Sequence, residues 1–177
     1  MDLAAVIASD DLPVLLREQP ALAAARDDNG VSALLLALYH RRRDACDALL
    51  AAGAPVGPLE AAALGDVEKL GEADLSVRGG DGFTPLHLAA FFGGAAAVKA
   101  ILARGADPDA DDENTFGVRP IHSAAAVGDV ESVRALLEAG ADPNVQQQSG
   151  HTPLDAAIRN GDEALAKLLR AHGAVSR

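Results

Sequence analysis

The sequence has few aromatic residues, one cysteine and no tryptophan. Aromatic side chains make up 3% of the 177 residues, although 49% of the chain is hydrophobic. We therefore expect a core of alanine, leucine and valine, which suits helices packed at short distance. The single cysteine, Cys46, excludes an internal disulfide framework and is typical of a reducing compartment.

Basic residues are also scarce. The chain has 15 Lys and Arg against 26 Asp and Glu, a formal net charge of −11. This excess of acid argues against nucleic acid or an anionic membrane as a partner. The N-terminal residues, MDLAAVIASDD, have no basic region and become acidic too soon for a secretory signal. No apolar run approaches the roughly 18 residues of a membrane span. We expect a soluble, acidic protein of the cytoplasm.

The clearest local pattern lies in residues 81–110, DGFTPLHLAAFFGGAAAVKAILARGADPDA. It begins with an Asp-Gly turn signal, followed by Thr84 and Pro85, a helix cap and a first-turn proline. Gly93-Gly94 end this helix, and a second apolar helix runs to Gly105, a position typical of a glycine C-cap. Two helices this short cannot bury their own apolar faces, so the unit needs neighbours.

The pattern returns twice further along the chain. Residues 118–125 (VRPIHSAA) and 152–157 (TPLDAA) repeat the first helix, and Pro85, Pro120 and Pro153 lie 35 and then 33 residues apart. A period of about 33 with a T-P-L-H-x-A core is the signature of ankyrin repeats. The chain therefore resembles an ankyrin-repeat protein, with three clear copies from residue 81 to the C-terminus.

The resemblance implies an all-α solenoid of five to six helix pairs joined by short β-turn hairpins, and we expect a monomer. The predicted units are an N-terminal cap over 1–29, a repeat over 30–56, an irregular short repeat over 57–80, repeats over 81–113 and 114–147, and a C-terminal cap over 148–177. The irregular unit lacks its hairpin segment, and Gly71 shortens its second helix. Whether it holds a complete helix pair stays open. The hairpin after residue 107 is two residues longer than the pattern needs.

Several residue types that carry chemistry elsewhere have structural explanations here. His87 and His122 stand at the histidine of the motif, and the resemblance implies that they bond threonine and backbone groups of adjacent hairpins. Cys46 falls on a buried helix face and is expected to be inert. The alternating acids of residues 107–113 lack the remaining features of a calcium loop. No nucleophile with its base, metal-ligand spacing or phosphate loop is visible. We predict no catalytic residue, cofactor, metal or small-molecule substrate.

The few aromatic residues fall on positions that, by the resemblance, face a concave groove. One position follows the hairpin glycine, and a pair of positions follows the Ala-Ala of the first helix. The hairpin positions are Val31, Phe83, Val118 and His151, and the helix pairs are Tyr39-His40, Phe91-Phe92, Ala126-Val127 and Arg159-Asn160. A core of alanine and leucine does not need aromatic residues there, whereas protein-binding hot spots are rich in them.

We therefore predict a protein-binding groove with an aromatic floor and an acidic rim at Asp109, Asp111, Asp112 and Glu113. A partner with an apolar element flanked by basic groups would complement it. The segment Arg41–Arg43 is expected on the same edge. The predicted contacts are Tyr39, His40, Phe83, Phe91, Phe92, Asp111, Asp112, Phe116, Val118, His151 and Arg159. Alternatives stay open: the aromatic residues pack between repeats as core, the chain self-associates through them, or it is an enzyme with an unrecognised site.

Overall fold

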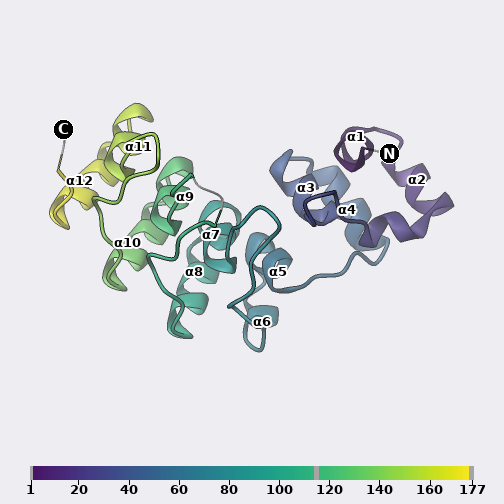
Figure 1. Cartoon of the computed structure of the whole chain (residues 1–177), viewed down its shortest axis with the longest axis horizontal. Coiled ribbons are helices and arrows are strands. Elements are labelled where there is room, and N and C mark those ends of the chain that lie inside the picture. Colours follow the sequence, from purple (N-terminus) through teal and green to yellow (C-terminus); the bar gives the residue numbers. More distant parts are fainter. Residues whose placement is uncertain (1, 114–115, 176–177) are drawn as a thin grey trace.

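The structure, a computed structural model, describes residues 2–113 and 116–175. Over these ranges the chain forms a single row of helix pairs that runs from the N-terminal to the C-terminal end (Figure 1). Apart from one isolated bridge between Arg26 and Ser32, the regular structure described is helical. The predicted all-α fold is confirmed.

Each predicted unit contains one helix pair, and we number the units one to six along the chain. The helices are α1 (Leu3–Ala8), α2 (Leu12–Glu18) and the 3-10 helix η1 (Pro20–Ala24) in unit one; α3 (Ala33–Tyr39) and α4 (Arg43–Ala51) in unit two; α5 (Pro58–Leu64) and α6 (Val67–Leu70) in unit three; α7 (Pro85–Leu88), the π-helical turn η2 (Ala89–Gly93) and α8 (Gly94–Ala103) in unit four; α9 (Pro120–Val127) and α10 (Val130–Glu138) in unit five; α11 (Pro153–Arg159) and α12 (Glu163–Ala171) in unit six.

Several helices begin at side chains that cap their free N–H groups. In unit six, the Thr152 hydroxyl accepts a hydrogen bond from the N–H of Asp155 at 3.2 Å, and the Asp155 carboxylate accepts one from the N–H of Thr152 at 2.8 Å. The second helices of units three, five and six start after an aspartate that caps the N–H three residues later, namely Asp66, Asp129 and Asp162. These local signals explain why the helices are short and regularly placed.

The core lies between successive helices and consists mainly of alanine and leucine. Alanines on the first helices, such as Ala62, Ala89 and Ala124, are fully buried. Their small side chains let α5 pack against η2, and η2 against α9. Larger buried side chains such as Leu86 and Leu136 each contribute roughly 1.5–3 kcal/mol by leaving water. No unit completes this core alone, so the units depend on one another.

The motif histidines link neighbouring units, as predicted. The Nδ1 of His87 lies 2.8 Å from the Thr84 hydroxyl, and its Nε2 lies 3.0 Å from the carbonyl oxygen of Val118 in the next unit. His122 repeats only part of the arrangement. Its Nε2 lies 3.1 Å from the carbonyl oxygen of Val145, which leads to the hairpin of unit six, but Arg119 stands in place of the threonine and its backbone N–H donates to Nδ1 at 3.0 Å. Burial lowers the pKa of both rings, which favours the neutral imidazole that has one donor and one acceptor.

Unit three does contain a helix pair, the point that the sequence left open. Its second helix, α6, has four residues and ends at Gly71. Its first helix, α5, has seven residues, as α3 and α11 have, although Pro58 and Gly65 are 7 positions apart whereas Pro120 and Gly128 are 8 apart. α3 contacts α5, but Figure 1 shows units one and two set off from the rest of the row.

One expectation about hydropathy was wrong. The segment Pro85–Ala103 has 19 residues and a mean hydropathy of 1.7, so by length and composition alone it could cross a membrane. By sequence, Gly93 and Gly94 break the apolar run, but glycine is close to neutral in hydropathy and hardly lowers the mean of the segment. In the fold, Gly94 has a φ of +76° and α8 packs back against η2, so the segment is a bent helix pair. Within this segment, 44% of the apolar window is buried in the protein.

Candidate functional site

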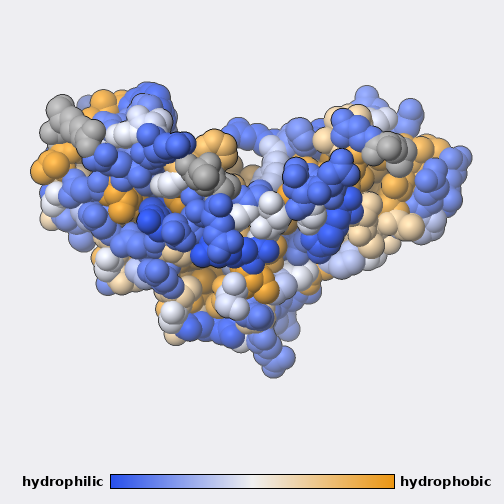
Figure 2. Space-filling model, viewed as in Figure 1, coloured by the Kyte–Doolittle hydropathy of each residue, from blue (hydrophilic) through white to orange (hydrophobic). Residues whose placement is uncertain are grey.

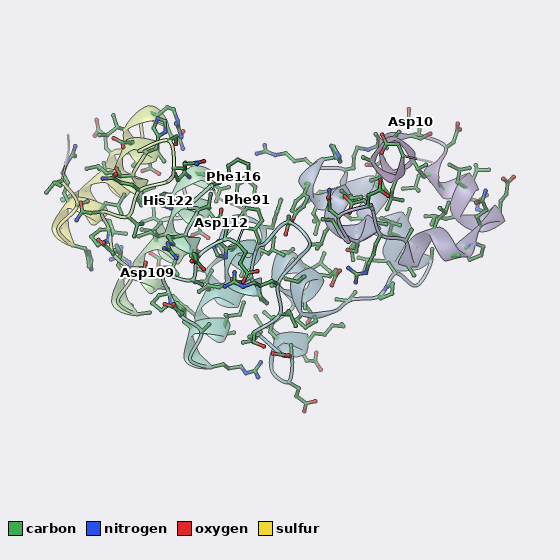
Figure 3. The ribbon with its side chains drawn as sticks, viewed as in Figure 1. Asp10, Phe91, Asp109, Asp112, Phe116 and His122 are labelled. Atoms are coloured by element: carbon green, nitrogen blue, oxygen red, sulfur yellow. The ribbon has the colours of Figure 1, made fainter. Side chains whose placement is uncertain are left out.

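A hollow of about 600 Å³ opens along the first helices and hairpins of units four and five, with unit two at its border. Figure 2 shows the surface hollowed between the two ends of the row. In Figure 3, Phe91 and Phe116 lie close together at this hollow, with Asp112 beneath them. We call the hollow the aromatic groove, and its apolar lining includes Tyr39, Phe83, Phe91, Phe92, Phe116 and Val118. The structure thus brings together six of the residues that the sequence predicted as contacts.

The aromatic rings of the groove also join unit two to unit four. Phe91 and Phe92 meet edge to face with ring centroids 4.6 Å apart, and Phe92 lies 5.6 Å from Tyr39. The Tyr39 hydroxyl donates a hydrogen bond to the Asp81 carboxylate. Burial and this carboxylate raise the pKa of Tyr39, so the phenol stays protonated. The ring contacts bridge the short third unit.

The aromatic residues therefore divide into two groups. Tyr39, Phe83 and Phe92 are partly buried and pack against the core, which agrees with the alternative that they support the fold. Phe91 is half-buried, and Phe116 is 61% exposed. Neither side chain belongs to the group that packs against the core, so we assign these two to the surface of the groove.

Asp112 does not lie on the rim, in contrast to the prediction. Its side chain is 6% exposed, and its two carboxylate oxygens accept hydrogen bonds from the N–H groups of Gly117 and Val118, each at 3.0 Å. The long hairpin has extra backbone N–H groups that need acceptors, and Asp112 supplies them. We therefore assign Asp112 to the loop and exclude it from the contact surface.

The other predicted rim acids are engaged within the protein. Asp111 is exposed but pairs with Arg78 at 3.5 Å and Arg119 at 3.7 Å, and Glu113 pairs with Arg78 at 3.1 Å. The Asp109 carboxylate accepts a hydrogen bond at 3.1 Å from the backbone of the next hairpin. Asp111 and Glu113 thus lie at the surface, but arginines of the protein offset part of the negative charge that was expected to attract a basic partner. Repeat spacing indicated neither ion pair: Arg119 lies at the end of the same loop as Asp111, and Arg78 lies in the hairpin before unit four.

Three further predicted contacts lie outside the lining of the groove. His40, His151 and Arg159 are all exposed. The His151 ring lies 2.8 Å from the Ser149 hydroxyl. Val31, at the equivalent hairpin position of unit two, is 6% exposed and belongs to the core. The groove is thus confined to units four and five and their contact with unit two.

A second hollow, of about 670 Å³, lies on the other side of Phe91 and Phe92. It is lined mainly by the two helices of unit two and by the C-terminal end of α5, and no sequence pattern indicated it. We call it the arginine hollow. Its lining includes Arg41, Arg42, Arg43, Leu38, Leu50 and Leu64 in addition to the two phenylalanines. The sequence predicts these arginines on the same edge as the acidic rim; instead they line this separate hollow and are not part of the lining of the aromatic groove.

The described residues offer little for catalysis or metal binding. They contain no group of three or more His, Cys, Asp or Glu side chains that could hold a metal ion. Cys46 is buried, and burial raises the pKa of its thiol, which favours the unreactive protonated form. The features that remain are the two hollows and their side chains.

Six stacked helix pairs with an open groove define the class of the protein, a helical-repeat solenoid. Within that class, the chain belongs to the ankyrin-repeat family, whose model (ankyrin repeats, three copies) matches residues 59–147 and 86–176. The chain is also 34% identical over 174 residues to the B-cell lymphoma 3 protein homolog of Mus musculus. That alignment covers 98% of this chain but 28% of the relative. Ankyrin repeats are typically protein-binding modules and are generally not catalytic.

Proposed function

We propose that the chain is a non-catalytic protein-binding module whose aromatic groove holds an apolar segment of a partner protein. The observation that carries the proposal is the meeting of half-buried Phe91 and exposed Phe116 in one apolar hollow of about 600 Å³. Contiguous exposed apolar surface usually marks an interface, and aromatic anchors contribute most of the binding free energy of many interfaces. The volume lies within the range of about 300–1,000 Å³ that is typical of ligand-binding pockets in proteins.

The proposal can be tested with a library of peptides displayed on phage and selected on the wild-type protein. We expect the selected peptides to share large apolar residues. Their affinities, measured by fluorescence anisotropy, should fall at least about tenfold with Phe91→Ala or Phe116→Ala, since truncation of a hot-spot side chain costs more than about 1.4 kcal/mol.

Ile158→Ala is the matched control, because Ile158 is also apolar and 51% exposed but lies outside the groove. It should leave the affinities unchanged, and circular dichroism should show that all three variants remain folded. Selected peptides that bind Phe91→Ala and Phe116→Ala as tightly as the wild type would refute the groove as the binding site.

Self-association through the same side chains gives a different result. A second copy in the groove would produce a dimer in light scattering that Phe91→Ala converts to monomer, whereas we propose a monomer.

We also propose that the protein is cytoplasmic. This proposal rests on the single buried Cys46 and can be checked by cell fractionation.

A further inference from the structure

We propose that the partner segment is apolar along one part and acidic at one end, so that it fills the aromatic groove and places carboxylates in the arginine hollow against Arg41 and Arg43. This inference rests on the proposed function and adds the chemistry of the partner. It replaces the basic flanks that the sequence predicted, because the acids expected to attract them are engaged within the protein.

The two hollows are adjacent and share a pair of side chains. Phe91 and Phe92 line both the aromatic groove and the arginine hollow. A segment that packs on Phe91 from the groove side therefore reaches the second hollow directly. There it meets Leu64 and Leu50 as well as the arginines, so the second contact is also partly apolar.

The arginines of this hollow differ in whether they form ion pairs within the protein. Arg42 is held by Asp44 at 2.7 Å and by Asp10 at 3.4 Å, and Asp10 lies on the N-terminal units in Figure 3. Arg41 and Arg43 are exposed and form no ion pair within the described residues. Asp47 also lines the hollow and offsets part of their charge.

Two arginines without an internal partner are notable in a chain with a net charge of −11. Carboxylates recognise the planar guanidinium group through paired hydrogen bonds, and an apolar wall at the side strengthens such contacts by excluding water. An acidic end is therefore the complement of this hollow. The same two arginines would repel a basic flank.

The backbone at Arg41 gives a second reason to assign its side chain to binding. Arg41 has a φ of +55°, a left-handed conformation that the equivalent turns of units three, five and six achieve with Gly65, Gly128 and Gly161 at 72°, 72° and 68°. A residue with a β-carbon is strained there, so glycine would serve the fold better. Strain retained at one position is a recognised pointer to function.

The test repeats the peptide selection on a double variant, Arg41→Gly with Arg43→Ala. Arg41→Gly relieves the strained turn and Arg43→Ala keeps a good helix former in α4, so the variant is expected to remain folded. Peptides selected on the wild type should combine large apolar residues with Asp or Glu at one end. Peptides selected on the variant should keep the apolar residues and lose the acidic preference.

Affinity measurements on one selected peptide then assign the acidic contact. Replacing its acidic residues by Gln or Asn should weaken binding to the wild type about tenfold at low salt, and much less at high salt. The same replacement should leave binding to the double variant unchanged. Phe91→Ala should weaken both peptides alike.

The outcomes separate this inference from the proposed function. Apolar enrichment without any acidic preference would overturn the inference and leave the groove as the binding site. Loss of the apolar enrichment as well would refute the proposed function. Binding of a short oligothymidylate that depends on Arg41 and Arg43 would also overturn the inference, because the hollow would then accept any polyanion.

Discussion

The carbonyl oxygen of Asn29 lies directly against Gly80, so that a β-carbon on Gly80 would stand 1.5 Å from it. Asn29 is the last residue of unit one and leads into the turn that opens unit two, and Gly80 leads in the same way into the hairpin of unit four. The two hairpins thus meet across unit three, which has no hairpin of its own. The ring contact between Tyr39 and Phe92 joins the same two units. These contacts therefore connect unit two to unit four across unit three, on the face of the row that carries the hairpins.

Gly80→Ala should weaken this bridge. The added methyl group would meet backbone atoms that cannot move aside as a flexible side chain can, and we expect a loss of about 1–3 kcal/mol in the free energy of unfolding. Urea unfolding followed by circular dichroism measures it, and hydrogen exchange should show lower protection around residue 29.

Gly53→Ala is the control for this change. Gly53 has a φ of +82° but no neighbouring atom within 4 Å of an added β-carbon, so its substitution introduces backbone strain without a collision. If Gly80→Ala costs no more than Gly53→Ala, the contact between the two hairpins does not hold the row together.

The repeats could be predicted because their signals are local. A cap residue, a proline and a glycine at fixed spacing determine where each helix begins and ends, as at Thr152, Pro153 and Gly161. The alanine and leucine positions follow from the same register. Whether α5 and α6 form a pair could not be settled from the sequence, because short helices depend on packing against their neighbours.

The groove could be predicted only in part. Repeat register placed Phe91 and Phe92 at the groove, but it could not show which aromatic rings also pack against the core. The surroundings of the acidic residues could not be predicted, because they depend on how the hairpins fold and stack. Asp112 turns inward to accept hydrogen bonds from Gly117 and Val118 of its own loop, and Asp111 pairs with Arg78, which lies 33 residues away. Such contacts between hairpins depend on how the units stack, which composition and spacing do not determine.

Two substitutions at Tyr39 distinguish the contribution of its hydroxyl to stability from the contribution of its ring. Tyr39→Phe removes the hydrogen bond to Asp81 but keeps the ring against Phe92, and we expect it to cost about 1 kcal/mol of stability. Tyr39→Ala removes both contacts and should cost about 3 kcal/mol. Urea unfolding measures the two values. Equal losses for the two variants would show that the ring contributes little to the bridge.

Arg41→Gly should stabilise the protein while it weakens binding of acidic segments. Release of the left-handed strain is worth roughly 1–2 kcal/mol, and the greater freedom of glycine in the unfolded chain offsets roughly 0.5–1 kcal/mol. The net gain should raise the thermal midpoint by a few degrees in differential scanning calorimetry. Arg43→Gly, a change within helix α4, should lower it instead. A lower midpoint for Arg41→Gly would contradict the assignment of strain.

Stability should fall as the pH drops below about 6.5, because His87 and His122 need to be neutral in the fold. Burial lowers the pKa of both side chains below the ordinary value of about 6.5. As the pH falls through about 6.5, the unfolded chain takes up protons on these rings while the folded chain does not. The unfolded state then binds more protons, so the free energy of unfolding decreases until the pH reaches the lowered values.

The contribution of the two histidines can be isolated by comparing pH profiles. Urea unfolding between about pH 7.5 and pH 5 should give a steeper loss for the wild type than for the double variant His87→Gln with His122→Gln. The variant is expected to be less stable at every pH, because the bonds to Val118 and Val145 change. Only the difference in slope matters, since the carboxylates titrate in both proteins. Parallel profiles would mean that the buried rings do not titrate in this window, and that the pH dependence comes from the acidic residues alone.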